Sequence, residues 1–251
     1  MSESKHSIER VRHEIRRREL EVRRVRHLTP QMLRVTLGGE AMQGFVSAAA
    51  DDHVKVFFPD NAAQPIARDY TPRRVDLRAL ELELDFVLHG DGPAAQWAAS
   101  ARAGQMLSIG GPRGSFVVAD DFDWYLLVGD ETALPAIGRR LEELRENTRV
   151  QAIVEVADAA ERQLLDSRAA LELSWLYRGH APAGEAAGLL AAVHSLTLPP
   201  GDGYAWIAGE SHMARALREH LVNERGLPKA WVKAAGYWKR GAVATHETHT
   251  D

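Results

Sequence analysis

Trp124-Tyr-Leu-Leu-Val128, followed directly by Gly129-Asp-Glu-Thr-Ala-Leu-Pro135, is the stretch that decides the fold of this chain. The continuous apolar run is typical of a strand that is covered on both faces, as in a parallel sheet. A helix is expected after the turn, over 136–146. Because open parallel sheets bind ligands beyond the carboxyl ends of their strands, the stretch predicts an α/β domain with a ligand site at this turn.

Strands and helices alternate through the rest of this half. Further strands are expected over 150–156, 171–177, 204–208 and 230–235, and helices over 159–166, 185–194 and 213–225. This alternation predicts βαβ units and a parallel sheet. Gly209 and Glu210 follow the fourth strand in the place equivalent to Gly129. The turns lack the GxGxxG pattern, so a tight Rossmann fingerprint is absent.

The first half has a different period. Leu80-Glu-Leu-Glu-Leu-Asp-Phe-Val-Leu88 alternates apolar and acidic residues, as half-buried strands do. Other strands are expected over 19–25, 32–37, 54–58 and 105–109, and one helix over 93–101 with Pro93 in its first turn. Short strands with turn signals predict an antiparallel β-barrel. We therefore expect a barrel domain over 1–120, an α/β domain over 121–241 and a disordered tail over 242–251.

Composition narrows the possible functions. The chain has 251 residues, a formal net charge of −4 and no cysteine, which excludes disulfides, thiol catalysis and cysteine-ligated clusters. It has no apolar run near the roughly 20 residues of a membrane span. Arg16-Arg-Arg18 is interleaved with Glu14 and Glu19, which we interpret as a strand face of mixed charge rather than a basic recognition arm. We expect a cytoplasmic monomer that neither binds nucleic acid nor inserts into a membrane, and that holds no metal, including at His246 and His249 of the tail.

Two segments of the first half carry residues suited to a flavin nucleotide. In Arg68-Asp-Tyr-Thr71, the arginine suits a phosphate, the tyrosine an aromatic ring system, and the threonine the N5 edge of a flavin. In His89-Gly-Asp-Gly-Pro93, a glycine-rich turn enters a helix, whose free N–H groups suit a pyrophosphate. Alone, each segment is also compatible with a structural strand or a plain turn and helix cap.

Four motifs together resemble those of the siderophore-interacting proteins. They are Arg68-Asp-Tyr-Thr, His89-Gly-Asp-Gly-Pro-Ala-Ala-Gln-Trp-Ala, Gly129-Asp-Glu-Thr-Ala-Leu-Pro-Ala-Ile and Gly236-Tyr-Trp-Lys-Arg-Gly. Members of this family are FAD-dependent ferric-siderophore reductases of the ferredoxin–NADP reductase superfamily. The resemblance runs from about Val22 to Gly241 and implies an FAD-binding barrel followed by an NAD(P)H-binding α/β domain.

The resemblance and the residue chemistry together give three sets of candidate site residues. For FAD they are Arg68, Asp69, Tyr70, Thr71, Val87, His89, Gly92, Pro93, Ala94, Ala95, Trp97 and Thr132. For NAD(P)H they are Gly129, Asp130, Glu131, Ala133, Pro135, Asp158, Arg162, Gly209 and Glu210. For an anionic ferric siderophore they are Lys55, Arg113, Lys239 and Arg240. We expect no protein nucleophile and no catalytic acid or base.

The predicted reaction is hydride transfer from NADPH or NADH to FAD, followed by one-electron reduction of siderophore-bound Fe(III). Asp158 would favour NADH through a ribose hydroxyl, whereas Arg162 and Arg178 would favour NADPH through its 2′-phosphate. Glu131 and Glu210 either contact the nicotinamide ribose or amide, or cap helices. Two other functions fit parts of the sequence: a general NAD(P)H:flavin or electron-transfer reductase, and a non-catalytic siderophore-binding protein.

Overall fold

The computed structural model describes residues 6–59, 66–88, 92–241 and 247–249. Their contacts divide the chain into two compact units. The first comprises Met1–Ala119 with Gly138–Arg140, and the second comprises Asp120–Ile137 with Leu141–Asp251. Among the described residues, no helix has the length and apolar character needed to cross a membrane.

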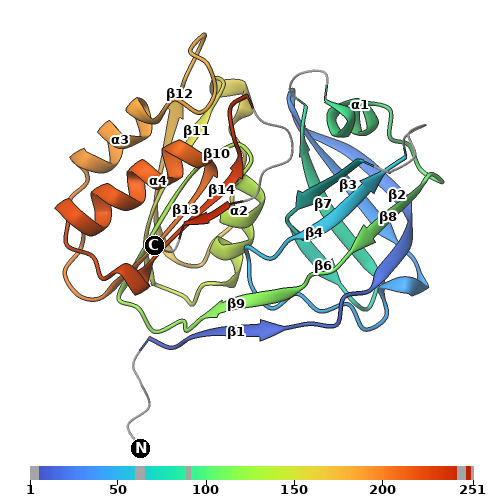
Figure 1. Cartoon of the computed structure of the whole chain (residues 1–251), viewed down its shortest axis with the longest axis horizontal. Coiled ribbons are helices and arrows are strands. Elements are labelled where there is room, and N and C mark those ends of the chain that lie inside the picture. Colours follow the sequence, from blue (N-terminus) through green and yellow to red (C-terminus); the bar gives the residue numbers. More distant parts are fainter. Residues whose placement is uncertain (1–5, 60–65, 89–91, 242–246, 250–251) are drawn as a thin grey trace, which may run out of the picture. The chain divides into compact units, whose positions relative to one another are not determined.

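The first unit is built on a curled antiparallel sheet of seven strands in the order β5-β4-β8-β2-β3-β7-β6 (Figure 1). These strands are β2 Arg17–Thr29, β3 Met32–Gly38, β4 Val54–Phe58, β5 Ile66–Tyr70, β6 Arg74–Asp76, β7 Glu81–Val87 and β8 Met106–Gly110. A separate antiparallel pair joins β1 Ile8–Arg12 to β9 Gly114–Val118. The helical elements are η1 Glu40–Met42 and α1 Pro93–Ala99. The expected antiparallel architecture is confirmed.

Strand β7 shows why this half folds as a half-buried sheet. Its side chains Leu82, Leu84 and Phe86 are fully buried in the core of the unit, whereas Glu81 and Glu83, which alternate with them, are partly exposed. Burying each apolar side chain contributes about 1.5–3 kcal/mol. The period of two in the sequence therefore fixes which face of the strand meets the core.

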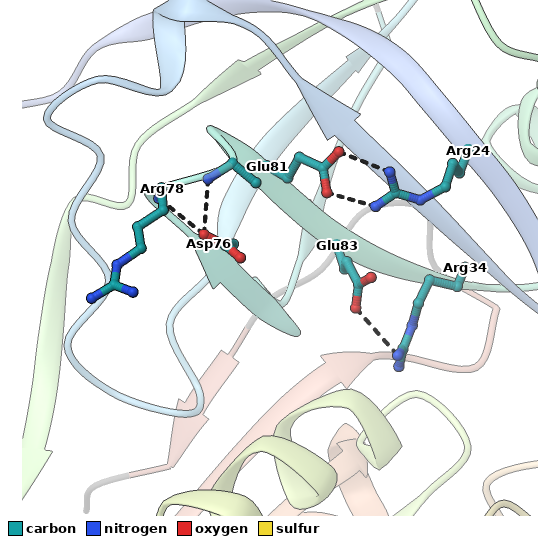
Figure 2. A network of polar contacts seen from close by, with 7 residues as sticks. Arg24, Arg34, Asp76, Arg78, Glu81 and Glu83 are labelled. Carbon is teal, nitrogen blue, oxygen red and sulfur yellow. Dashed lines mark hydrogen bonds and ion pairs between the residues drawn. The ribbon is translucent and has the colours of Figure 1, made fainter.

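Charged residues of different strands pair on the sheet (Figure 2). Arg24 of β2 donates two hydrogen bonds to the carboxylate of Glu81 on β7, at 2.8 and 2.5 Å. Arg34 of β3 lies opposite Asp85 in register and donates to it at 2.6 and 2.8 Å. A further contact of 3.3 Å joins Arg34 to Glu83. The acidic residues that alternate along β7 are thus balanced by arginines of β2 and β3.

The N-terminal arginines are balanced in the same way. Arg16 lies 2.6 Å from Glu14, and Arg23 lies 2.9 Å from Glu21. These pairs are exposed, so water and salt screen them and they add little to stability. Their arrangement agrees with a strand face of mixed charge and leaves no block of unbalanced arginines at these positions.

The second unit holds a six-stranded sheet in the order β12-β11-β10-β13-β14-β15. Its first five strands are parallel: β10 Trp124–Asp130, β11 Arg149–Val156, β12 Ala170–Tyr177, β13 Gly203–Glu210 and β14 Val232–Trp238. The helices are α2 Leu134–Glu143, α3 Ala186–Ser195 and α4 Ser211–Glu219, with short turns η2 Ala159–Glu161, η3 His220–Glu224 and η4 Lys229–Trp231. Every residue of β10 is buried, as its continuous apolar run predicts. The expected C-terminal α/β domain with a parallel sheet is confirmed.

Three local expectations for this unit differ from the structure. The helix expected over 159–166 is only the short turn η2, because the segment has no core to cover and Leu164 is 93% exposed. The last strand begins at Val232 rather than at 230. Glu247–His249 form strand β15 within the tail expected to be disordered, because they pair antiparallel with the otherwise open edge of β14 at 234–236.

Candidate functional site

The segment Arg68-Asp-Tyr-Thr lies on β5 and directly beyond its end. β5 pairs antiparallel with β4, which places Asp69 opposite Lys55. Lys55 Nζ lies 2.9 Å from Asp69 Oδ1, but the contact lacks hydrogen-bond alignment, so this oxygen is buried without a hydrogen bond. Arg68 donates to the carbonyl of Ala67 at 2.8 Å and pairs with no acidic side chain among the described residues. Its positive charge is therefore available to an anionic ligand.

An aromatic cluster brings this segment together with helix α1. The ring of Tyr70 lies 4.3 Å from that of Phe86, and Phe86 lies 5.5 Å from Trp97 of α1, measured between ring centroids. Phe58 contacts Tyr70 and Trp97 at 6.1 and 5.6 Å. Burial raises the pKa of the Tyr70 hydroxyl, so the phenol stays neutral. Two segments expected to hold one ligand thus share a single packed cluster.

The N-terminus of α1 is uncapped by any side chain. Gly92 occupies the cap position in an extended conformation, Pro93 is the first helical residue, and Gly92 accepts a backbone hydrogen bond from Gln96. A Cβ built on Gly92 meets no described heavy atom within 4 Å. The N–H groups of Ala94 and Ala95 belong to the first turn, where the helix leaves donors unpaired. His89 lies outside the described residues. Val87 is the last residue of β7.

Thr71 completes this group in the first unit. It is buried, and its hydroxyl has no hydrogen-bond partner among the described residues. The hydroxyl oxygen itself is not among the buried atoms without a partner, so it is accessible and free to bond a ligand. Together with the unpaired Arg68, the neutral ring of Tyr70 and the uncapped turn at Gly92, it fits the ring system and pyrophosphate of FAD.

The turn after β10 in the second unit requires glycine at its first position. A Cβ on Gly129 would lie 2.4 Å from Cβ of Ala133 and 2.6 Å from the carbonyl oxygen of Ala208. These distances are shorter than any real Cβ contact, so a larger residue would displace the turn. Ala133 and Pro135 are buried where α2 begins. The turn therefore brings the strand end and the helix start into direct contact.

Asp130 of this turn accepts hydrogen bonds on both of its carboxylate oxygens. Its Oδ1 accepts hydrogen bonds from the backbone N–H and the hydroxyl of Thr132, at 2.9 and 2.5 Å. Its Oδ2 accepts one from Nε1 of Trp238 at 2.8 Å. Burial, together with the charge of Glu131, raises the pKa of Asp130 to about 6, against the lowering effect of these hydrogen bonds. Asp130 therefore titrates close to neutral pH.

Glu131 and Arg178 form a nearly buried ion pair beside Asp130. Arg178 donates two hydrogen bonds to the Glu131 carboxylate, at 2.7 and 2.5 Å. Glu155, at the end of β11, is buried, and burial raises its pKa to about 7, although Arg178 lowers it and neighbouring carboxylates add to the rise. This edge of the sheet therefore holds Asp130, Glu131 and Glu155 around one arginine.

Glu210 acts as a helix cap. Its Oε2 accepts hydrogen bonds from the backbone N–H groups of His212 and Met213, at 2.7 and 3.0 Å, at the start of α4. The side chain is 2% exposed. Gly209 before it has φ +145°, and the strand register shifts between these two residues. Of the two roles considered for Glu210, the structure shows the cap.

The remaining nicotinamide candidates are exposed. Asp158 accepts a hydrogen bond from the backbone of Ala160 at 2.7 Å and caps the turn η2. Arg162 follows this turn, and its side chain has no partner among the described residues. Arg178 is already bound to Glu131, so of the two arginines considered for a 2′-phosphate, Arg162 is the available one.

The four basic substrate candidates differ in their availability. Lys55 is paired with Asp69, as described above. Arg240 donates from its guanidinium to the carbonyl of Ala183 at 2.8 Å, and Lys239 also has an interaction partner. Arg113 is exposed and has no side-chain partner in the described part of the chain. Lys55 and Arg113 lie in the first unit, and Lys239 and Arg240 in the second.

Sequence reasoning missed four residues of these clusters. Phe86 and Phe58 connect Tyr70 to Trp97, and both were read only as strand residues. Glu155 is the penultimate residue of β11, so the rule that ligand sites lie at the carboxyl ends of parallel strands was the signal that points to it. Trp238 belonged to a recognised motif, but its bond to Asp130 is invisible in sequence.

Comparisons with known proteins identify the family of this chain. The family model described as "Siderophore-interacting protein" matches residues 122–241, and the model "Siderophore-interacting FAD-binding domain" matches residues 21–65 and 60–116. The NADPH-dependent ferric-chelate reductase of Escherichia coli is 36% identical, with 92% of this chain and 96% of that protein covered. The ferric vibriobactin reductase ViuB of Vibrio cholerae is 32% identical, with 89% and 90% covered.

Solved structures extend the comparison. A siderophore utilization protein from T. fusca superposes with a TM-score of 0.89 at 39% identity, and the match covers 95% of this chain and 98% of that one. More distant reductases, at 20% identity, share the fold alone.

Proposed function

Because this chain belongs to the siderophore-interacting protein family, we propose that it passes electrons from NADPH through FAD to the Fe(III) of a ferric siderophore. It is an oxidoreductase, like the relatives named ferric-chelate reductase and ferric vibriobactin reductase. FAD, when bound, accepts two electrons as a hydride and passes them on singly. Hard oxygen ligands hold Fe(III) much better than Fe(II), so reduction releases the metal.

The single observation that carries this proposal is the cluster formed by β5, β7 and α1. Tyr70, Phe86 and Trp97 pack as one aromatic group, with the unpaired Arg68 on the same strand as Tyr70. In our proposal Arg68 binds a phosphate, the Tyr70 ring packs beside the flavin, and Thr71 bonds its N5 edge. The first turn of α1 donates N–H groups to the pyrophosphate.

In the second unit, Asp130 and the Gly129 turn are proposed to hold the nicotinamide nucleotide beyond the end of β10. Arg162 is proposed to bind the 2′-phosphate of NADPH, since its side chain is exposed and has no partner among the described residues. The ratio of kcat/KM for NADPH to that for NADH measures this preference. A ratio near one would contradict the assignment to NADPH.

Arg113 is the proposed first contact of the anionic ferric chelate, with Lys55 as a weaker contributor because Asp69 offsets its charge. Such residues act by attraction, so their effect falls with rising salt. We further propose that the protein works as a monomer in the cytoplasm.

The experiment that tests the function is a spectrum of the purified protein after incubation with FAD. We expect bound flavin, bleaching by NADPH without oxygen, and return of the colour when a ferric siderophore is added. A protein that binds the siderophore but no FAD would instead be a binding protein. Reoxidation by free flavin but not by the ferric siderophore would identify a general flavin reductase.

A further inference from the structure

Two histidines and a glutamate of types that can bind a metal gather in the second unit at the ends of helices α3 and α4, which run side by side (Figure 1). His194 is in the last turn of α3, and His220 and Glu224 are the ends of the π-helical turn η3 that continues α4. The rings of His194 and His220 are 3.6 Å apart between centroids. A π-helical turn costs hydrogen-bond geometry and is often found at functional positions.

The polar atoms of these residues converge. His220 Nδ1 lies 2.9 Å from Glu224 Oε2, and His194 Nε2 lies 4.0 Å from the same oxygen. The ligand atoms of the three residues all lie within 4.8 Å of one another. The other nitrogen of His220 is buried without a partner, so Nδ1 makes the polar contact of this ring.

The carboxylate of Glu224 is not already neutralised. No lysine or arginine pairs with it in the described part of the chain. The neighbouring Arg225 instead donates to the carbonyls of Val193 and Leu196, at 3.2 and 2.9 Å. The Glu224 charge is therefore free to balance a cation between the two helices.

One of the three side chains in the cluster is buried, and the other two are exposed to solvent. The side chain of His220 is 3% exposed, whereas those of His194 and Glu224 are 51% and 63% exposed. Tetrahedral ligands of one zinc ion lie roughly 3.3 Å apart, so a modest rotation of the exposed His194 brings its nitrogen into range. Solvent access leaves room for an ion to enter and for water to complete its coordination.

We propose that His194, His220 and Glu224 form a binding site for a divalent first-row transition metal. Two imidazoles and one carboxylate suit Zn²⁺, Fe²⁺ and Co²⁺, whereas Mg²⁺ prefers an all-oxygen site. The site is separate from the residues proposed to hold FAD and NADPH. Its existence therefore does not depend on the proposed reaction.

The test is calorimetric titration of Zn²⁺ into the full, tag-free, FAD-loaded chain after treatment with a chelator, with Mg²⁺ in parallel. His194→Gln and Glu224→Gln change exposed side chains and should fold normally; His220→Gln is the third variant. His27→Gln, an exposed histidine of β2, is the matched control. The metal-induced rise in Tm is recorded for each, since it separates metal binding from any change in basal stability.

We expect wild type and His27→Gln to bind one Zn²⁺ here and to gain several degrees in Tm, with no effect of Mg²⁺. His194→Gln and Glu224→Gln should weaken the Kd by at least about tenfold and lose the gain in Tm. Absence of Zn²⁺ binding by the wild type would overturn the proposal. Zn²⁺ binding that survives unchanged in both variants would also overturn it, because the ion would then be held by other histidines.

Discussion

Trp238 donates a hydrogen bond from its indole Nε1 to Oδ2 of Asp130, at 2.8 Å and across 108 positions of sequence. Asp130 ends β10 and Trp238 ends β14, with β13 lying between these strands in the sheet. The bond therefore connects the carboxyl ends of strands that are not neighbours. It also supports a buried carboxylate at the turn where the nicotinamide nucleotide is proposed to bind.

Trp238→Phe should destabilise the protein by about 1–3 kcal/mol at pH 8, because it leaves a charged, buried carboxylate with one hydrogen bond fewer. The loss should be smaller at pH 5, where Asp130 is largely protonated. Urea unfolding at the two pH values measures this loss of unfolding free energy. Trp175→Phe is the control, since the indole N–H of Trp175 has no hydrogen bond among the described residues. Equal losses at both pH values would contradict the role given to Trp238.

Asp130 should make stability depend on pH between about 4 and 6. Its folded pKa of about 6 lies above the ordinary value of 3.8, so the folded protein binds more protons than the unfolded chain in this window. The stabilising contribution is complete below pH 4 and is lost as the pH rises through 6. Asp130→Asn should therefore show a smaller fall in unfolding free energy from pH 4.5 to pH 7, by on the order of 2 kcal/mol. Parallel pH curves for variant and wild type would refute this.

The two arginines considered for the 2′-phosphate should behave differently. Arg178→Gln removes one partner of a nearly buried ion pair and should cost about 3–5 kcal/mol in stability, with similar effects on the use of NADPH and NADH. Arg162→Gln should leave stability unchanged and reduce the NADPH/NADH ratio of kcat/KM by about tenfold or more. A selective loss of NADPH use in Arg178→Gln alone would reverse the assignment.

Arg68→Gln should weaken FAD binding by about 10- to 100-fold, because it removes a charge-assisted hydrogen bond to phosphate. The effect should diminish at high salt. Arg26→Gln changes an exposed arginine of β2 and serves as the control. Titration with FAD, followed by flavin fluorescence, gives the dissociation constants of wild type and of each variant. An unchanged dissociation constant in Arg68→Gln would contradict the assignment of Arg68 to the FAD site.

The local pattern of apolar and polar residues predicted the strands that are buried continuously or at every second residue. The continuous run from Trp124 to Val128 identified a strand that is buried along its whole length, and the alternation at Leu82, Leu84 and Phe86 identified a half-buried one. Residues 159–166 have helical character in sequence but no surface to pack against, so only η2 forms. Tertiary contact, rather than propensity, decided that segment.

The candidate site was predictable where it follows strand ends and glycine turns, as at Gly129 and Gly209. Pairings between distant side chains were not. Arg178 was considered for a phosphate, but it lies 47 positions from Glu131 and pairs with it, which no spacing rule reveals. Lys55 was chosen for its charge, and only the register of β4 and β5 shows that Asp69 lies opposite it.

The central claim is tested most directly by counting the iron released in one turnover. FAD-loaded protein is reduced without oxygen by one equivalent of NADPH and mixed with excess ferric siderophore and an Fe(II)-specific chelator. Since one hydride carries two electrons, the account predicts about two Fe(II) per NADPH, formed at the rate at which flavin colour returns. Flavin that stays reduced, with no Fe(II) trapped, would contradict the account.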